Sequence, residues 1–228
     1  MNERLPLTVA NLKANKTWPE MSRWISDFIA NRPQFEGTIV VCPSFPFLAA
    51  ASEEIRNLID VYRAFDLNLK LGCQDISIFE QGAYTGEVAA SQLFKVCQFA
   101  IIGHSERRQN FKEDDSMLAR KVERARQSSL EPIFCVQGPE TSIPPQVTIV
   151  AYEPVFAIGT GLPDTPENAF TVSREIKKRG DYKVIYGGSV TSDNVHSFLQ
   201  EGTVDGVLVG GKSLDPFSFI GVVKNASY

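Results

Sequence analysis

Side chains that can transfer protons or stabilise negative charge follow three short apolar runs of the sequence. Asn11 and Lys13 end the first of these runs, His104 and Glu106 follow another, and Glu153 ends a third. A carboxylate can act as a base, an imidazole can donate a hydrogen bond, and an ammonium group can stabilise a developing oxyanion. If these side chains meet at one place, they are suited to proton transfer on a small anionic molecule.

The apolar runs that precede these residues have the composition of buried strands. Most of them are almost continuously apolar rather than alternating, which is typical of strands covered on both faces of a parallel sheet. In a barrel the carboxyl ends of such strands meet at one rim, where active sites form. The eight predicted strands are residues 7–12, 38–42, 67–73, 99–103, 132–136, 147–152, 183–186 and 206–209.

Helical segments separate most of the predicted strands. Thr17 and Glu20 form a capping box at the start of one helix, and Thr165 precedes another. Asp193 or Asp215 could cap two more. Strand–helix alternation repeated about eight times indicates a barrel or a doubly wound sheet, and eight strands in 228 residues favour the barrel. We therefore expect an α/β fold, a single (β/α)8-barrel domain spanning residues 1–228.

The fifth strand–helix unit is incomplete. Only residues 136–146 separate the fifth and sixth predicted strands, and Pro139, Pro144 and Pro145 lie among them. An ordinary helix of about 11 residues with two loops does not fit in this space. We predict that the fifth helix is missing or reduced to a turn. The barrel wall beside these strands would then be thinly covered, unless a partner subunit covers it.

Composition and charge argue against several classes of function. The chain has 43% hydrophobic and 22% charged residues, with no apolar run near the roughly 18 residues that span a membrane. Its net charge of −4 argues against a general nucleic-acid surface. Two histidines are too few for a multi-histidine metal site, and Cys42, Cys73, Cys97 and Cys135 are predicted to be reduced core residues. Because we find no secretory signal, we expect a cytoplasmic protein.

Several longer segments of the chain resemble triosephosphate isomerase, and they occur in family order. This resemblance implies a TIM barrel that interconverts dihydroxyacetone phosphate and D-glyceraldehyde 3-phosphate through an enediolate, with no metal or organic cofactor. The segments are Asn11-Leu-Lys13, Gly82-Ala-Tyr-Thr-Gly-Glu87, Ile102-Gly-His-Ser-Glu-Arg-Arg108, Ala151-Tyr-Glu-Pro-Val-Phe-Ala-Ile-Gly-Thr-Gly161, Tyr186-Gly-Gly-Ser-Val190 and Val204-Asp-Gly-Val-Leu-Val-Gly-Gly211.

The resemblance implies a catalytic role for each of the polar residues named above. Glu153 is expected to take a proton from the carbon beside the carbonyl, and His104 to donate a hydrogen bond to the carbonyl oxygen as a neutral ring. Lys13 is expected to face both the phosphate and the developing charge, and Asn11 to orient the substrate oxygens. Glu106 is expected to pair with Lys13 or to assist proton transfer, although it could be a simple helix-start carboxylate.

Backbone N–H groups are expected to bind the substrate phosphate. The predicted groups belong to Gly159, Ser189, Gly210 and Gly211, because glycine allows close approach of a ligand to the backbone. Glycine pairs often serve only to make tight bends. Pairs that end the last two strands of a barrel, however, occupy the usual phosphate position of this fold.

Residues 154–165 resemble the family's lid, with a small-residue tip that would exclude water on closing. Tyr186 and Ser189 are expected to latch it. Phe156 stands where the family usually has a tryptophan, and Gly138 ends a stretch where the family usually has a glutamate. Because those two family residues can pair in the open lid, we expect the open lid to be held differently here and to open with different kinetics.

The loop at residues 82–87 implies at least a homodimer. In the family this loop reaches into the neighbouring subunit, so Thr85 is expected to contact the partner near its Asn11 and His104. Whether the assembly is a dimer or a tetramer is left open.

Two other functions are left open by the residues alone. One is a barrel that only binds a phosphorylated metabolite, which the loss of Glu153 or Lys13 would favour, but both residues are present. The other is a different sugar-phosphate isomerase or epimerase, which would need a metal cluster or other acids at the strand ends. A coupled assay on glyceraldehyde 3-phosphate separates these alternatives.

Overall fold

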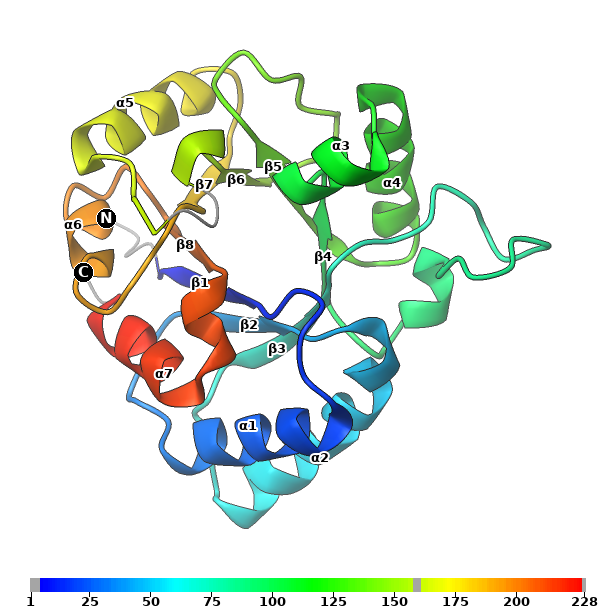
Figure 1. Cartoon of the computed structure of the whole chain (residues 1–228), viewed down its shortest axis with the longest axis vertical. Helices are drawn as coiled ribbons and strands as arrows, with labels where there is room; N and C mark the ends of the chain where they lie inside the picture. The colour runs from blue at the N-terminus through cyan, green and yellow to red at the C-terminus, as the bar shows by residue number, and fades with distance from the viewer. Residues whose placement is uncertain (1–4, 158–160, 227–228) are drawn as a thin grey trace.

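The computed structural model describes residues 5–157 and 161–226, which form a closed barrel of eight parallel strands (Figure 1). Each strand pairs with its neighbours in chain order, and β8 closes the barrel against β1. The predicted TIM-barrel class is confirmed, and the predicted strands begin and end within two residues of the observed ones. The strands are β1 (Leu7–Asn11), β2 (Thr38–Cys42), β3 (Leu69–Cys73), β4 (Phe99–Ile102), β5 (Glu131–Val136), β6 (Ile149–Tyr152), β7 (Lys183–Tyr186) and β8 (Gly206–Val209).

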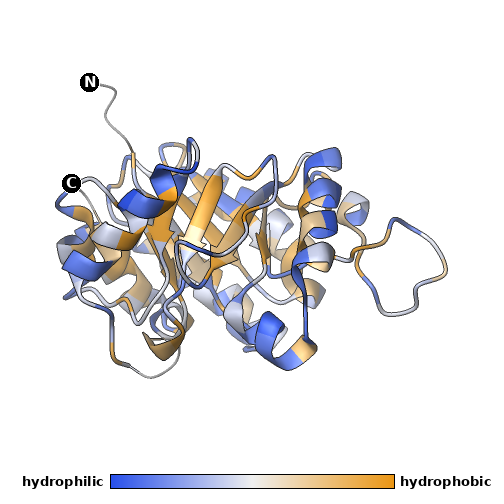
Figure 2. Cartoon of the chain, turned by 90° about the horizontal axis from the view of Figure 1, so that it is seen from above, coloured by the Kyte–Doolittle hydropathy of each residue, from blue (hydrophilic) through white to orange (hydrophobic). Residues whose placement is uncertain are grey.

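The side chains of the strands form two apolar layers, one inside the barrel and one between the barrel and its helices. In β5, Ile133 and Cys135 belong to the inner layer, and Phe134 and Val136 to the outer one. Figure 2 shows this apolar centre, with polar residues on the outer faces of the helices. Because both faces of each strand are covered, nearly every strand residue is apolar, as the sequence indicated.

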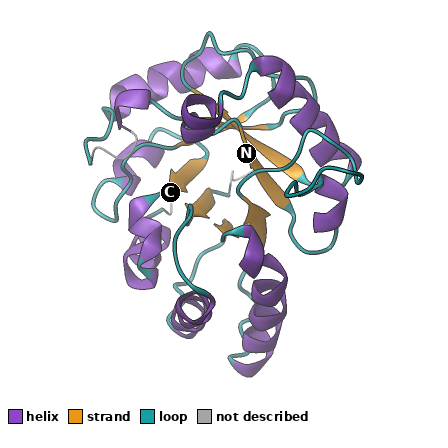
Figure 3. Cartoon of the chain, turned by 45° about the vertical axis from the view of Figure 1, so that its right-hand side comes forward, coloured by secondary structure: helices purple, strands orange, loops and turns teal. Residues whose placement is uncertain are grey.

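Helices surround the strands on the outside of the barrel (Figure 3). Two predicted starts are confirmed, since Glu20 accepts a hydrogen bond from Thr17 N at 2.7 Å, and Thr165 Oγ1 accepts one from Asn168 N at 3.2 Å. The helices are α1 (Trp18–Ala30), α2 (Leu48–Val61), α3 (Ser105–Phe111), α4 (Asp115–Gln127), α5 (Pro166–Lys177), α6 (Val195–Leu199) and α7 (Pro216–Asn225).

Of the two aspartates proposed as caps, Asp215 caps a helix and Asp193 does not. The Asp215 carboxylate accepts a hydrogen bond from Ser218 N at 2.7 Å at the start of α7. The helix α6 begins one residue too late for Asp193, with Asn194 in the capping position. The Asn194 side chain instead accepts from Thr191 N at 2.8 Å, which closes a turn before the helix.

No described helix is long and apolar enough to cross a membrane.

The connection between β5 and β6 contains no helix, as predicted. All of residues 137–148 are described, and they form turns and irregular backbone. The connection runs outside the barrel between α4 and α5 (Figure 1). The sequence did not predict that the β3–β4 connection also carries only a short 3-10 helix, Ala90–Leu93, in its described residues.

The expectation that this flank of the barrel is thinly covered is wrong. Phe134 on β5 is 1% exposed, and Val150 and Tyr152 on β6 are 0% and 4% exposed within the single chain. The irregular connection supplies part of the cover, because Ile143 packs against the outer apolar layer. The apolar side chains of a short loop therefore replace the missing helix, and no partner subunit is needed to bury β5 and β6.

Two arginines fasten this connection to the helices on either side. Arg126 at the end of α4 donates to Gln146 O at 2.7 Å and also bonds both carboxylate oxygens of Glu131. Arg179, just beyond α5, donates to Thr141 O at 2.9 Å. Each arginine satisfies backbone carbonyl groups that a helix would otherwise have satisfied internally.

Arg126→Ala is expected to lower the free energy of unfolding by about 2 kcal/mol, because it removes charge-assisted hydrogen bonds to Glu131 and frees the connection. For a chain of this length the melting temperature should fall by about 5 °C. Thermal unfolding followed by circular dichroism measures the change. Arg120→Ala, an exposed position on the same helix, is the control. Equal melting temperatures for the two variants would contradict this role of Arg126.

Candidate active site

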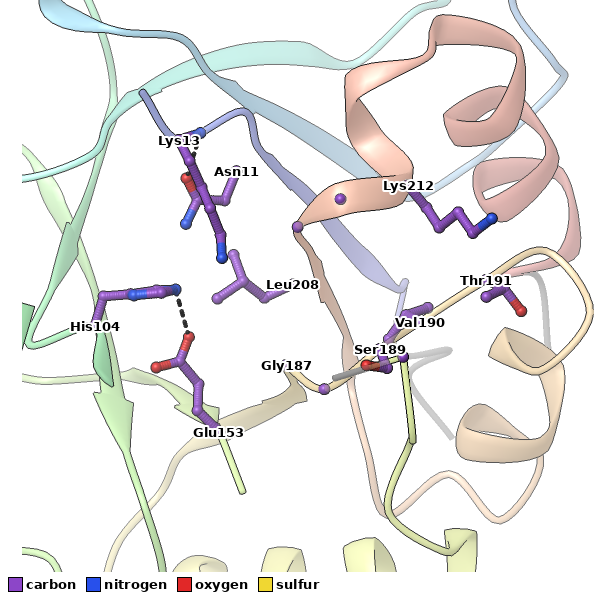
Figure 4. A pocket seen from close by; sticks show the side chains of 14 residues that line it. Asn11, Lys13, His104, Glu153, Gly187, Ser189, Val190, Thr191, Leu208 and Lys212 are labelled. Carbon is purple, nitrogen blue, oxygen red and sulfur yellow. Dashed lines mark hydrogen bonds and ion pairs between the residues drawn. The ribbon is translucent and has the colours of Figure 1, made fainter. Parts of the chain in front are cut away.

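A pocket of about 540 Å³ opens at the carboxyl end of the barrel strands (Figure 4). Asn11 is the last residue of β1, Glu153 follows β6 directly, and His104 precedes the first turn of α3. These three residues and Lys13 all line the pocket. The fold thus brings together four side chains that lie far apart in the sequence, because a closed parallel barrel collects all its strand ends at one rim.

The imidazole of His104 and the carboxylate of Glu153 are in polar contact inside the pocket. The Nε2–Oε1 distance is 3.0 Å, and the two residues are only 5% and 1% exposed. His104 Nδ1 accepts a hydrogen bond from Glu106 N at 3.2 Å, and Ser105 N donates to Glu153 Oε2 at 2.9 Å. Because Nδ1 accepts, a neutral ring must carry its proton on Nε2, the atom that faces Glu153. The first turn of α3 thus holds both side chains.

Lys13 projects into the pocket from a turn that follows β1. Its backbone has φ of 52°, a left-handed conformation that is unusual for a lysine. The turn is held because Asn11 Oδ1 accepts from Lys13 N at 3.1 Å and Gln74 Nε2 donates to Lys13 O at 2.8 Å. The Lys13 ammonium group forms an ion pair with Glu106, which itself does not line the pocket. Glu106 therefore lies where it can orient Lys13.

The backbone of the connections that follow β7 and β8 forms another part of the pocket wall. Ser189, Gly210 and Gly211 line it, and Ser189 has a left-handed φ of 51°. Gly210 lies beside the lysine, since a Cβ atom on Gly210 would be in ordinary van der Waals contact with Cε of Lys13, at 3.4 Å. Gly159, the fourth predicted phosphate ligand, lies outside the described residues.

Tyr186 and Ser189 contact the two described ends of the segment that resembles a lid. Ser189 Oγ donates to Ala157 O at 2.7 Å, before residues 158–160, and Asp164 N donates to Tyr186 Oη at 2.8 Å, after them. Burial raises the pKa of Tyr186 above its ordinary value. Asp164 also accepts from Tyr152 Oη at 3.1 Å, so two strand-end tyrosines hold the second end of the segment.

The family model described as triosephosphate isomerase matches residues 6–146 and 140–226 of the chain. The chain belongs to the triosephosphate isomerase family. It is 33% identical to a triosephosphate isomerase of Thermus thermophilus, over 98% of this chain and 99% of the relative. It is also 36% identical to one of Dictyoglomus thermophilum, over 97% and 100%, and 35% identical to one of Halorhodospira halophila, over 84% and 87%.

The family comparison also indicates where this triosephosphate isomerase family member is shortened. The two matched segments meet at residues 140–146, inside the β5–β6 connection that lacks a helix. The alignment with the T. thermophilus relative takes 257 positions, although this chain has only 228 residues. The relative must therefore carry residues that this chain lacks, and the broken match points to the β5–β6 connection as the main site of the difference.

Several pocket residues were not singled out from the sequence. Thr191, Leu208 and Lys212 also line the pocket. Leu208 is part of an apolar strand and gave no signal of its own, but Lys212 follows the Gly210-Gly211 pair directly and could have been noticed as a cation beside a predicted phosphate site. Across residues 5–157 and 161–226, no group of three or more His, Cys, Asp or Glu side chains is arranged to hold a metal ion.

Proposed function

We propose that the chain is an aldose–ketose isomerase that interconverts dihydroxyacetone phosphate and D-glyceraldehyde 3-phosphate, with Glu153 as the base and His104 as the hydrogen-bond donor. The observation that carries this assignment is the 3.0 Å contact between His104 Nε2 and Glu153 Oε1 in a pocket that also contains Lys13. A buried carboxylate and a donor in contact can act on adjacent atoms of one three-carbon substrate.

The proton transfer follows from the positions of these two groups. On substrate binding, a substrate oxygen takes the place of Glu153 Oε1 beside His104 Nε2 and accepts a hydrogen bond from it. Glu153 then removes the proton from the carbon beside the carbonyl, and the C–H electron pair forms the carbon–carbon double bond of the enediolate. The carbonyl π electrons move to oxygen, where His104 donates. The hydroxyl proton of the enediolate moves to the former carbonyl oxygen through His104, which lies beside the substrate oxygens. Glu153 returns its proton to the other carbon, and the carbonyl re-forms on the oxygen that lost its proton.

Lys13, Asn11 and Glu106 support this step in the proposal. The Lys13 ammonium group stabilises the negative charge that develops on the enediolate and also attracts the phosphate. Asn11 holds the Lys13 turn through its side-chain oxygen, and its amide NH2 group is left to orient a substrate oxygen. Glu106 positions the lysine through their ion pair.

The phosphate is proposed to bind the backbone N–H groups of Ser189, Gly210 and Gly211, together with Gly159. The first three line the pocket, and none of them places a bulky apolar side chain there. Closure of residues 154–165 over the substrate would exclude water and strengthen the charge interactions within the pocket.

The decisive test is a coupled assay that follows consumption of D-glyceraldehyde 3-phosphate by the purified chain. Turnover to dihydroxyacetone phosphate supports the proposal. Binding of the substrate without turnover would instead identify a non-catalytic phosphometabolite-binding barrel, and turnover to a different epimer or isomer would identify another sugar-phosphate enzyme.

We further propose that residues 1–228 form one domain in the cytoplasm and that two copies associate through the loop around Thr85. This loop extends away from the barrel (Figures 1 and 2), and Thr85 and Tyr84 at its tip are exposed. Tyr84 stacks on Phe79 with their ring centroids 3.9 Å apart, which stiffens the loop. A stiff, projecting loop loses little conformational entropy when it binds a second copy.

Thr85→Arg is expected to shift the chain from dimer to monomer, because a large cation at the tip cannot enter a close-packed interface. Light scattering over a range of protein concentrations measures the mass. Thr171→Arg, an exposed position on α5, is the control for the added charge. A monomeric mass for the unmodified chain, or a dimeric mass for Thr85→Arg, would rule out this interface.

A further inference from the structure

The pocket contains a second lysine, Lys212, at the end away from the proton-transfer groups. Lys13 points toward His104 and Glu153, whereas Lys212 extends from a 3-10 helix, Gly211–Leu214, toward the side on which Thr191 lies (Figure 4). Both lysines line the same pocket. Lys13 therefore lies beside the proton-transfer groups, and Lys212 lies beside the proposed phosphate-binding backbone.

The base of the Lys212 side chain is fixed next to this backbone. The following residue, Ser213, is fully buried, and its hydroxyl donates to Gly210 O at 2.7 Å. Trp24 Nε1 donates to Ser213 O at 2.9 Å, which fastens the turn to α1. Lys212 itself is exposed, and its long side chain can bring the ammonium group to an anion held by the neighbouring N–H groups.

Charge balance distinguishes the two lysines. The charge of Lys13 is already compensated by Glu106. Among the described residues, no carboxylate lies within 4.0 Å of the Lys212 ammonium group. The substrate phosphate is a dianion, and the chain as a whole has a net charge of −4. The net negative charge of the chain repels the phosphate dianion. An uncompensated cation at the pocket rim counters that repulsion locally and attracts the substrate.

We propose that Lys212 is a substrate-positioning residue that binds the outer face of the substrate phosphate and increases the rate of substrate capture. The inference rests on the proposed isomerase function and adds a contact to its phosphate site. Lys212 lies at the opposite end of the pocket from Glu153, so it acts on KM and on the association rate. The proton-transfer step, and with it kcat, does not depend on it.

Three variants test the proposal. Lys212→Met keeps the length of the side chain and removes its charge, Lys212→Arg keeps the charge, and Lys224→Met removes one exposed positive charge from the last turn of α7 as a matched control. Lys212→Met is expected to raise KM for D-glyceraldehyde 3-phosphate about fivefold, the effect of one exposed ion pair, and to leave kcat within about twofold. Its kcat/KM should also depend less steeply on ionic strength.

Direct binding of inorganic phosphate separates this proposal from the isomerase assignment. Calorimetric titration should give a dissociation constant for phosphate that is about fivefold higher in Lys212→Met than in the unmodified chain. The dissociation constants of Lys212→Arg and Lys224→Met should stay close to that of the unmodified chain. The titration needs no turnover, so it tests Lys212 whether or not the chain is an isomerase. Absence of isomerase activity would overturn the proposed function alone. Three results would overturn the role of Lys212. They are unchanged phosphate affinity in Lys212→Met, an equal loss of phosphate affinity in Lys224→Met, and a fall in kcat of Lys212→Met at constant KM.

Discussion

Glu153→Gln is expected to lower kcat/KM for D-glyceraldehyde 3-phosphate by a factor of about 10³, with most of the loss in kcat. The glutamine amide has nearly the same size as the carboxylate, and its oxygen can still accept the hydrogen bond from Ser105 N. It cannot accept a proton from carbon. The substitution therefore removes the base while it leaves the shape of the pocket and the phosphate-binding backbone in place.

The coupled isomerase assay measures this loss, and competitive inhibition by inorganic phosphate serves as a second readout. The inhibition constant should change by less than about twofold, because phosphate does not need the base. Glu36→Gln, at an exposed position, is the matched control for the lost charge. Activity in Glu153→Gln equal to that of the unmodified chain would show that another group takes the proton.

Lys13→Met is expected to lower kcat/KM by a factor of about 10² to 10³, through both kcat and KM. The ammonium group is the only cation at the reacting end of the pocket in the described part of the chain, so its loss removes stabilisation of the enediolate and attraction of the phosphate. Stability should change little, since the partner Glu106 side chain is 42% exposed and can be hydrated once the ion pair is lost.

Steady-state kinetics and thermal unfolding of the same samples separate these two effects. Lys70→Met, an exposed position on β3, removes the same charge outside the pocket and should behave as the unmodified chain. A large fall in the melting temperature of Lys13→Met would mean that the lysine has a structural role. Unchanged kinetics would exclude it from the site.

Local features of the sequence were sufficient to locate most of the helices and strands. Strands could be recognised because both faces are buried, so that inward Ile133 and outward Phe134 are both apolar. Helix starts depend on groups a few residues apart, such as Glu20 with Thr17 or Asp215 with Ser218. Asp193 was misassigned because the neighbouring Asn194 takes the capping position, and such competition between neighbours is hard to judge from residue types.

The candidate site was also largely predictable, because the order of polar residues at successive strand ends determines which of them share a rim once the barrel closes. Asn11, Lys13, His104 and Glu153 accordingly line one pocket. Their detailed geometry was not predictable. That His104 Nδ1 accepts from Glu106 N, and so directs Nε2 toward Glu153, follows from how α3 leaves β4.

The sequence by itself determined the barrel class, the absence of a fifth helix and the set of polar residues at the rim, since each depends on residue types over short stretches. Only the tertiary structure decided how the flank beside β5 and β6 is covered and which charges pair. Arg179 bonds a carbonyl 38 residues away, and Lys13 pairs with a carboxylate 93 residues away. Contacts at such separations leave no local pattern, because they depend on the packing of the closed barrel.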